Sequence, residues 1–196
     1  MEDEVYGPGW MAFQRRFDGS VKFFGRSWEE FKHGFGNESG EYYLGNEMLH
    51  LLTTKEKHDY LVVATNFSDA AQSKLIRNVR INNEWDSYRI VYRAEDVDFV
   101  KSSIEYGHKM INRPFSTFDR ENDTTPDYEC ATQFGAWWHL ACHSVGMNGK
   151  YRSASNYKGT HMYANGIIWE KFKGFSDFFE SLKTSLLMIR PSKFKV

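Results

Sequence analysis

The segment from Asp119 to Tyr151 restricts the possible folds of this chain more than any other part of the sequence. It begins with an oxygen-rich run and then contains both cysteines of the chain, Cys130 and Cys142. A pair of adjacent tryptophans lies between the cysteines, and a histidine follows the second one. If the cysteines close a loop, its aromatic residues are held around a rigid and partly apolar concavity.

The oxygen-rich run consists of Asp119, Glu121, Asn122 and Asp123. Clustered carboxylates with an amide between them suit a hard cation such as calcium, which binds many oxygens in loose geometry. The run does not fit an EF-hand, because it lacks the glycine at the sixth position and the glutamate at the twelfth position of that loop. By itself, the run predicts either a solvated turn or a calcium site of another type.

Composition indicates one globular domain and excludes several partners. A chain of 196 residues can bury a sizeable core, and the aromatic content of 17% suits irregular β-rich packing. The net charge of -1 argues against nucleic acid or an anionic membrane as a partner. No apolar run approaches the ~20 residues of a membrane-spanning helix. A basic cluster near the end is interpreted as a solvated face: Lys171, Lys173, Arg190, Lys193 and Lys195.

Local patterns predict a sheet with short helices in the first half of the chain. Alternation predicts a strand over Trp10–Phe17, and Asp18-Gly19 predicts a hairpin turn into a second strand over Val21–Phe24. The spacing of Ser27 and Glu30 predicts a capping box that opens a helix ending at Phe35. Further strands are predicted over Tyr60–Asn66, Leu75–Ile81 and Tyr88–Arg93.

A second helix is predicted after Asn46, which is expected to cap it, with Met48, Leu51 and Leu52 on one face. From Glu95 onward the periodicity fades and turn residues dominate. Long irregular segments in compact domains usually carry a binding site, so the site is expected in the second half.

Motifs along nearly the whole chain resemble the fibrinogen-related domain, the C-terminal globular module of fibrinogen, ficolins, tenascins, angiopoietins and tachylectins. The run from Gly9 to Ser20 is similar to the opening motif of that family, Gly-Trp-Thr-Val-Phe-Gln-Arg-Arg-x-Asp-Gly-Ser. Cys-Ala at 130–131, Gly-Ala-Trp-Trp at 135–138, Cys-His at 142–143 and Met-Asn-Gly-Lys-Tyr at 147–151 follow in the order of the family. Ala-Asn-Gly-Ile-Ile-Trp at 164–169 and Met-Ile-Arg-Pro at 188–191 match its close. The chain is therefore identified as a member.

The resemblance implies an α+β fold of the fibrinogen C-terminal type, with a twisted antiparallel sheet, short helices and a long irregular second half that bears the site. It divides the domain at 1–196 into a sheet-containing central subdomain at 1–94 and an irregular ligand- and calcium-binding subdomain at 95–196. Family members carry a further N-terminal segment with its own disulfide, so we expect Met1 to follow such a segment.

The resemblance also implies a Cys130–Cys142 disulfide and one calcium ion. The calcium ligands of the family fall on Glu121 and Asp123, with carbonyls near Thr125 and Asp127, and Asp119 is included in the expected set. Glutamate replaces the first aspartate of the family pattern, and the run to Cys130 is one residue longer than usual.

Two other uses of the cysteines fit the spacing poorly. Zinc sites usually pair their ligands as Cys-x2–4-Cys or His-x3–5-His, whereas His139, Cys142 and His143 stand beside a lone Cys130. A nucleophilic cysteine needs a base in hydrogen-bonding reach and a group that orients the base, and an adjacent histidine has the wrong geometry. The disulfide is favoured.

In ficolins and tachylectins an acetyl group inserts beside the loop that this disulfide closes. By resemblance, the Ala141-Cys142 peptide is cis and the pocket is lined by Phe134, Ala141, Cys142, His143, Tyr163, Ala164 and Phe175. The fibrinogen pocket has an aspartate after the tyrosine and an arginine further on, where this chain has Ala164 and Phe175. An apolar pocket is ill-suited to an ammonium group, because its desolvation is costly.

These features predict a secreted, non-enzymatic, lectin-like module of innate immunity that binds N-acetylated glycans or other acetylated ligands on microbial or cell surfaces, supported by Ca2+. An oligomer is expected for the full-length protein, with no nucleic acid and no membrane insertion. Three glycosylation sequons begin at Asn37, Asn66 and Asn122. The alternative is a receptor ligand or adhesion module of the angiopoietin or tenascin kind, in which exposed Tyr106, Met110 or Phe115 would contact a receptor protein.

Overall fold

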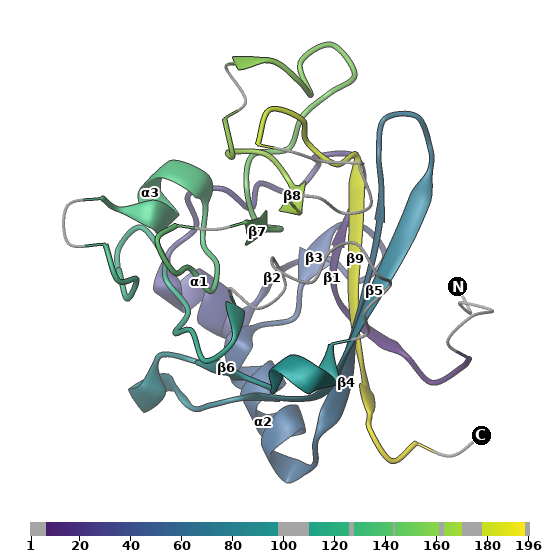
Figure 1. The fold of residues 1–196 in the computed structure, drawn as a ribbon, viewed down its shortest axis with the longest axis vertical. Helices are drawn as coiled ribbons and strands as arrows, with labels where there is room; N and C mark the ends of the chain where they lie inside the picture. The colour runs from purple at the N-terminus through teal and green to yellow at the C-terminus, as the bar shows by residue number, and fades with distance from the viewer. Residues whose placement is uncertain are drawn as a thin grey trace.

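In the described part of the chain the main element is an antiparallel sheet of seven strands, whose long strands run along the right of Figure 1 with the α-helices to their left. The computed structural model describes residues 7–97, 110–125, 128–142, 144–160, 163–169 and 178–194. The sheet order is β2 (Phe35–Gly36), β3 (Tyr42–Tyr43), β1 (Met11–Arg16), β9 (Thr184–Pro191), β4 (His58–Thr65), β5 (Ala71–Ile81) and β6 (Ile90–Val91). Two short strands, β7 (Val145–Gly146) and β8 (Ile168–Trp169), pair separately.

The last strand of the chain lies in the middle of this sheet. β9 is inserted between β1 and β4, with Met188 opposite Ala12 on one side and Ile189 opposite Tyr60 on the other. β9 comes from the second half of the sequence, so a division at residue 94 does not separate the sheet from the irregular part. The expected α+β fold with a twisted antiparallel sheet and short helices is confirmed.

The sequence predicted the long strands correctly, but the predicted first hairpin is absent from the described structure. β1, β4 and β5 all begin and end within four residues of their expected bounds, whereas no strand covers 21–24. β1 pairs with β3 and β9 instead. Glu41 directly precedes β3, and its buried carboxylate accepts hydrogen bonds from the backbone N–H groups of residues 17, 18, 19 and 21. Those donors are therefore used by a side chain and cannot form a hairpin ladder.

The first helix, α1 (Trp28–His33), begins with the predicted capping box between Ser27 and Glu30. The second, α2 (Asn46–Lys55), differs from the prediction. Asn46 is a buried first residue of this helix, its preceding residue provides no side-chain cap, and Met48 and Leu51 are exposed. Leu49 and Thr53 are buried instead, because α2 turns a different stripe toward β5.

Short helical turns connect the remaining elements: η1 (Glu84–Asp86), η2 (Ala94–Asp96) and α3 (Cys130–Phe134). The core between them is rich in aromatic rings. Phe115 packs 5.0 Å from Trp138 and 5.3 Å from Phe31, and Trp137 is 1% exposed. Met110 and Phe115 are fully buried, so their predicted exposure was wrong. Tyr106 lies outside the described residues. Among the described residues, no helix has the length and apolar character of a membrane span.

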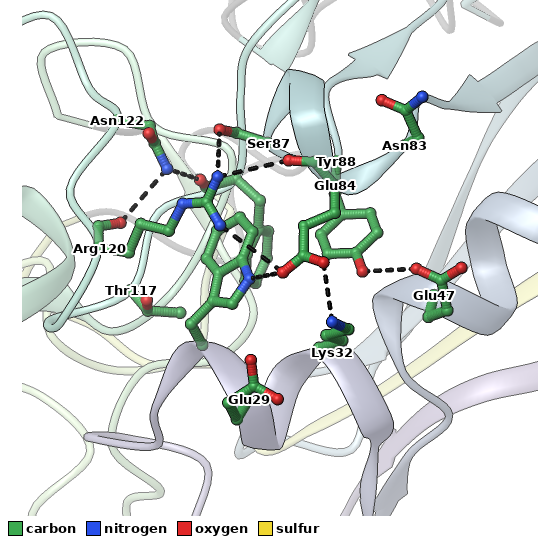
Figure 2. Close-up of polar contacts among 12 residues, drawn as sticks. Glu29, Lys32, Glu47, Asn83, Glu84, Ser87, Tyr88, Thr117, Arg120 and Asn122 are labelled. Atoms are coloured by element: carbon green, nitrogen blue, oxygen red, sulfur yellow. Dashed lines mark hydrogen bonds and ion pairs between the residues drawn. The ribbon is translucent and has the colours of Figure 1, made fainter.

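A polar cluster joins η1 to α1 and to the loop that follows Phe118 (Figure 2). The carboxylate of Glu84 accepts hydrogen bonds from Trp28 Nε1 at 2.7 Å and from Lys32 Nζ at 2.8 Å. The guanidinium of Arg120 lies 3.9 Å over the Trp28 ring and 3.7 Å from the Glu84 carboxylate. These contacts fix Arg120 against α1 and thereby position the neighbouring acidic residues.

Candidate functional site

The expected disulfide is present in the structure. Cys130 and Cys142 are bonded, and Cys130, the first residue of α3, is fully buried. The peptide bond between Ala141 and Cys142 is cis. The disulfide holds the segment that ends at Cys142 against the start of α3, so these two segments form one rigid unit.

Two acidic side chains accept hydrogen bonds from the first backbone N–H groups of α3. Glu121 Oε1 accepts from Ala131 N at 3.0 Å and from Thr132 N at 3.3 Å, and Asp123 Oδ2 accepts from Cys130 N at 3.3 Å. Asp123 Oδ1 also accepts from the amide and the hydroxyl of Thr125, at 2.8 and 2.6 Å. The acidic loop and the disulfide loop are therefore joined at the start of α3.

The two carboxylates differ in their electrostatics. Burial, together with the neighbouring carboxyl of Asp123, raises the pKa of Glu121 to about 7. The pKa of Asp123 is lowered despite burial, because the Thr125 hydroxyl and several N–H groups donate to its charged form. Glu121 Oε2 is buried without a hydrogen-bond partner. A cation beside these carboxylates would relieve both the repulsion and the unmatched oxygen.

Asp119, included in the expected metal-ligand set, is used elsewhere. Its carboxylate accepts hydrogen bonds from the backbone N–H of Trp28 at 2.9 Å and from the Thr117 hydroxyl at 2.7 Å. It therefore satisfies the first free N–H of α1, and we leave it out of the ligand set.

The remaining residues fit calcium. Glu121 and Asp123 supply carboxylate oxygens, one of them buried and unmatched, and calcium accepts oxygens in loose geometry. Within the described part of the chain no three His, Cys, Asp or Glu side chains gather as a metal site. The rest of the shell would come from backbone carbonyls and water, as expected near Thr125. Asp127 lies outside the described residues.

A cavity of about 430 Å³ lies beside the disulfide. Its lining residues are Thr125, Tyr128, Phe134, Ala141, Cys142, Tyr163, Ala164 and Phe178. The Phe134 ring is 8% exposed and forms the floor, whereas Tyr128 and Tyr163 are about half exposed and form the sides, 6.0 and 6.5 Å from it. A further ring, Phe178, lies 5.8 Å from Tyr163. The result is an open aromatic pocket.

The structure brings together most of the residues expected around the acetyl pocket. Phe134, Ala141, Cys142, Tyr163 and Ala164 all line the cavity, although their sequence positions span thirty residues. His143 and Phe175 lie outside the described residues. Ala164 adopts a positive φ of 56° and its N–H donates to Phe178 O at 2.6 Å, which turns this segment toward the cavity.

Sequence reasoning missed three residues of the lining. Tyr128 and Phe178 are aromatic and stand close in sequence to the expected site, so their residue type was the available signal. Thr125 was expected only as a metal ligand, yet it lines the cavity and also bonds Asp123. The acidic loop therefore contributes directly to the pocket wall.

The disulfide removes the alternatives for the cysteines. Both thiols are consumed, so neither can ligate zinc or act as a nucleophile while the bond is intact. His139 is fully buried, with Nε2 at 2.7 Å from Gly135 O, and burial lowers its pKa to about 4. This histidine is a neutral core residue.

The chain belongs to the fibrinogen-related family. It matches the family described as fibrinogen beta and gamma chains, C-terminal globular domain, over residues 1–192. The solved fibrinogen-like globe domains of human ANGPTL2 and ANGPTL6 are similar in structure, with TM-scores of 0.82 and 0.80 and sequence identities of 34% and 31%. Each alignment covers 98% of this chain, and 84% and 82% of those chains respectively.

Curated relatives show the same relationship. Ryncolin-4 of Cerberus rynchops is 37% identical over 95% of this chain, and microfibril-associated glycoprotein 4 of Mus musculus is 38% identical over 94% of it. The chain spans 51% of the first relative and 69% of the second. The chain is thus a fibrinogen-like domain.

Proposed function

We propose that this domain reversibly binds acetylated carbohydrate in the aromatic cavity beside the Cys130–Cys142 disulfide. The observation that carries the proposal is the lining: aromatic rings and alanines surround a cavity of about 430 Å³ that opens to solvent. A methyl group gains contact with such walls, and the neighbouring backbone amides can hydrogen-bond a carbonyl. The ligands would be N-acetylated glycans or other acetylated groups on microbial or cell surfaces, a role in innate immunity.

Charge supports an acetyl group over a peptide N-terminus. Among the described residues, none of the eight that line the cavity carries a carboxylate, and alanine occupies position 164. An ammonium group placed there would lose its hydration without an opposite charge in contact. A solved relative, lamprey fibrin D-dimer, is complexed with the peptide Gly-His-Arg-Pro-amide, at 29% identity and a TM-score of 0.80. The described lining of the cavity in this chain offers no opposite charge to such a terminus.

Calcium is proposed to support the same site. Glu121 and Asp123 would hold the ion, and both also bond the start of α3, whose last residue is Phe134. Binding to the folded state alone stabilises that state and would stiffen the Thr125 wall of the pocket. Calcium should therefore raise both the melting temperature and the affinity for acetylated sugar.

An extracellular location is proposed with this function, since a buried disulfide persists in oxidising environments. One acetyl pocket buries little area, so a single domain should bind at about millimolar Kd, and several domains presented together would provide avidity. The sequons at Asn37 and Asn66 remain candidates for glycosylation. Asn122 does not suit it, because its side chain donates to Phe115 O at 2.8 Å within the acidic loop.

The decisive experiment titrates the protein with N-acetylglucosamine and with glucosamine, in calcium and in chelator. Binding of the acetylated sugar alone, lost in Tyr163→Ala, is the expected result. Trp85→Ala is the matched control, because Trp85 is 96% exposed and lies outside the cavity. Equal binding of both sugars, or equal loss in both variants, would refute the proposal.

The alternative is a protein-binding module of the angiopoietin or tenascin kind. One observation favours it: Trp85 is 96% exposed on η1, a turn fixed by the contacts of Glu84 (Figure 2). Exposed tryptophans held on rigid turns are frequent anchors of protein interfaces. Loss of receptor binding in Trp85→Ala with unchanged sugar binding would support this alternative.

A further inference from the structure

A second cavity, of about 480 Å³, is lined by four cationic side chains. Its walls are formed by Arg16, Gly19, Val21, Lys22, Phe23, Phe24, Lys150, Tyr151 and Arg152. Within the part of the chain that the structure describes, no acidic residue belongs to this lining. The residues come from two segments, one running from the last residue of β1 to Phe24 and one following the Met-Asn-Gly motif, so the tertiary fold concentrates the positive charge. We name this cavity the basic pocket.

The cations of the basic pocket are held in place by the protein. Arg16 is 1% exposed, and its Nη1 donates to Met147 O and Gly149 O, both at 2.8 Å. Its guanidinium lies 4.5 Å over the Phe23 ring, and Lys150 Nζ lies 4.6 Å over the Phe24 ring. Cations packed on aromatic faces are preorganised, so less side-chain entropy is lost when an anion arrives.

Donor capacity in the basic pocket is not fully used. Arg16 Nε and Arg152 Nε are both buried without a hydrogen-bond partner. Arg152 also donates from Nη2 to Asn165 Oδ1, which fixes its orientation. Both Nε atoms are closed to solvent, so an anion in the pocket would interact with their positive charge without accepting a hydrogen bond from them.

The nearby acidic groups are already committed. Glu41 faces Arg16, but its carboxylate accepts four backbone N–H groups from the loop at 17–21. Asp18 is exposed and accepts from Ser20 N at 2.9 Å. The cationic charge of the pocket therefore exceeds the acidic charge around it, while the whole chain carries a net charge of only -1. The positive potential is local to the pocket.

We propose that the basic pocket binds a sulfate or carboxylate group carried by an acidic saccharide. Guanidinium and ammonium groups form charge-assisted hydrogen bonds with such oxyanions, and the Phe24 and Tyr151 rings offer apolar contact for the attached ring. The carrier is assigned from the fold. Lys150 N donates to Asn165 O at 2.8 Å, and the preceding residue, Ala164, lines the acetyl pocket. The segment at 164–165 thus contacts the basic pocket on one side and lines the other cavity, and the choice of a saccharide as carrier rests on this link together with the proposed function.

The test of the anion site uses inorganic sulfate and does not involve the acetyl pocket. Lys22 and Lys150 are exposed, so Lys22→Gln/Lys150→Gln removes half of the cationic charge without disturbing the core. The control Lys57→Gln/Lys193→Gln removes two exposed lysines outside the pocket. Sulfate also stabilises proteins by exclusion, and therefore the comparison between variants, at an ionic strength matched with chloride, is what counts.

The expected result is saturable stabilisation of the wild type and the control, with an apparent sulfate affinity about tenfold weaker in Lys22→Gln/Lys150→Gln. Identical titrations of the two double variants would overturn the anion site. The carrier is then tested with N-acetylglucosamine 6-sulfate, N-acetylglucosamine and an acidic peptide of aspartates. A sulfated sugar that binds no better than the unsulfated one, or a peptide that binds better than both, would overturn the saccharide assignment. Failure of the acetyl pocket would instead appear as lost N-acetylglucosamine binding with the sulfate response intact.

Discussion

Removal of the Cys130–Cys142 bond tests how the site is held together. The bond joins residues that are 12 apart in sequence. Closing a loop of that length reduces the conformational entropy of the unfolded chain, which stabilises the folded state by about 3 kcal/mol. Cys130→Ala/Cys142→Ala should lower the free energy of unfolding by about that amount. For a chain of this size, the melting temperature would fall by about 6–12 °C.

The loss should be concentrated at the site. The first N–H groups of α3 donate hydrogen bonds to Glu121 and Asp123, and Ala141 and Cys142 line the cavity proposed to bind the acetyl group. Without the bond, α3 and the segment before Cys142 can separate, and the pocket loses its fixed wall. Binding of acetylated sugar should therefore weaken even at temperatures where the variant is fully folded.

Urea unfolding monitored by tryptophan fluorescence measures the stability, and sugar titration at 10 °C below the variant's melting temperature measures the site. The single variants Cys130→Ala and Cys142→Ala provide the internal control. Each removes the whole bond, so each should cost nearly as much as the double variant, and the effects should not add. Additive losses, or a double variant with wild-type stability, would show that this reasoning is wrong.

Three further predictions follow from the structure. Tyr163→Ala and Trp85→Ala should each change the free energy of unfolding by only about 0.5 kcal/mol in urea titrations, because these rings are 53% and 96% exposed; a loss of several kcal/mol would mean that the side chains are packed. Calcium should raise the melting temperature of the wild type in scanning fluorimetry but not that of Glu121→Gln, and equal curves in calcium and chelator would count against the metal site. Burial lowers the pKa of His139 from 6.5 in the unfolded chain to about 4 in the folded protein, so the unfolded state binds the proton first. The free energy of unfolding should therefore fall by up to about 3 kcal/mol as the pH drops from 6.5 towards 4. If the free energies of unfolding of wild type and His139→Gln change in parallel from pH 7 to 4, this prediction is contradicted.

Part of the fold was predictable because its signals are local. The capping box of Ser27 and Glu30 requires residues three apart, and β4 contains a short apolar run that is buried along most of its length and pairs with β5. The false hairpin after β1 shows the limit of such signals. Its turn residues are present, but the distant carboxylate of Glu41 takes up the backbone donors of the loop.

The buried face of α2 was missed for a similar reason. Met48 and Leu51 are more apolar than Thr53, yet Thr53 is buried, because its hydroxyl accepts from Ile81 N at 2.9 Å and donates to Leu49 O at 2.8 Å. Likewise, Asp119 reads as a calcium ligand in sequence but completes the start of α1, 91 residues away. Side chains that satisfy distant backbone groups cannot be recognised from local pattern.

The sequence by itself determined the family and the disulfide partners, since long motifs in a fixed order specify the fold, and it placed alanine at 164, where the fibrinogen pocket has an aspartate. Only the tertiary structure decided which residues meet. Insertion of β9 between β1 and β4 and the return of residues 147–152 to the end of β1 bring Arg16 beside Arg152, so the basic pocket has no counterpart in the sequence. Potential depends on distance in space, and residues more than one hundred positions apart become neighbours only through the packing of the core.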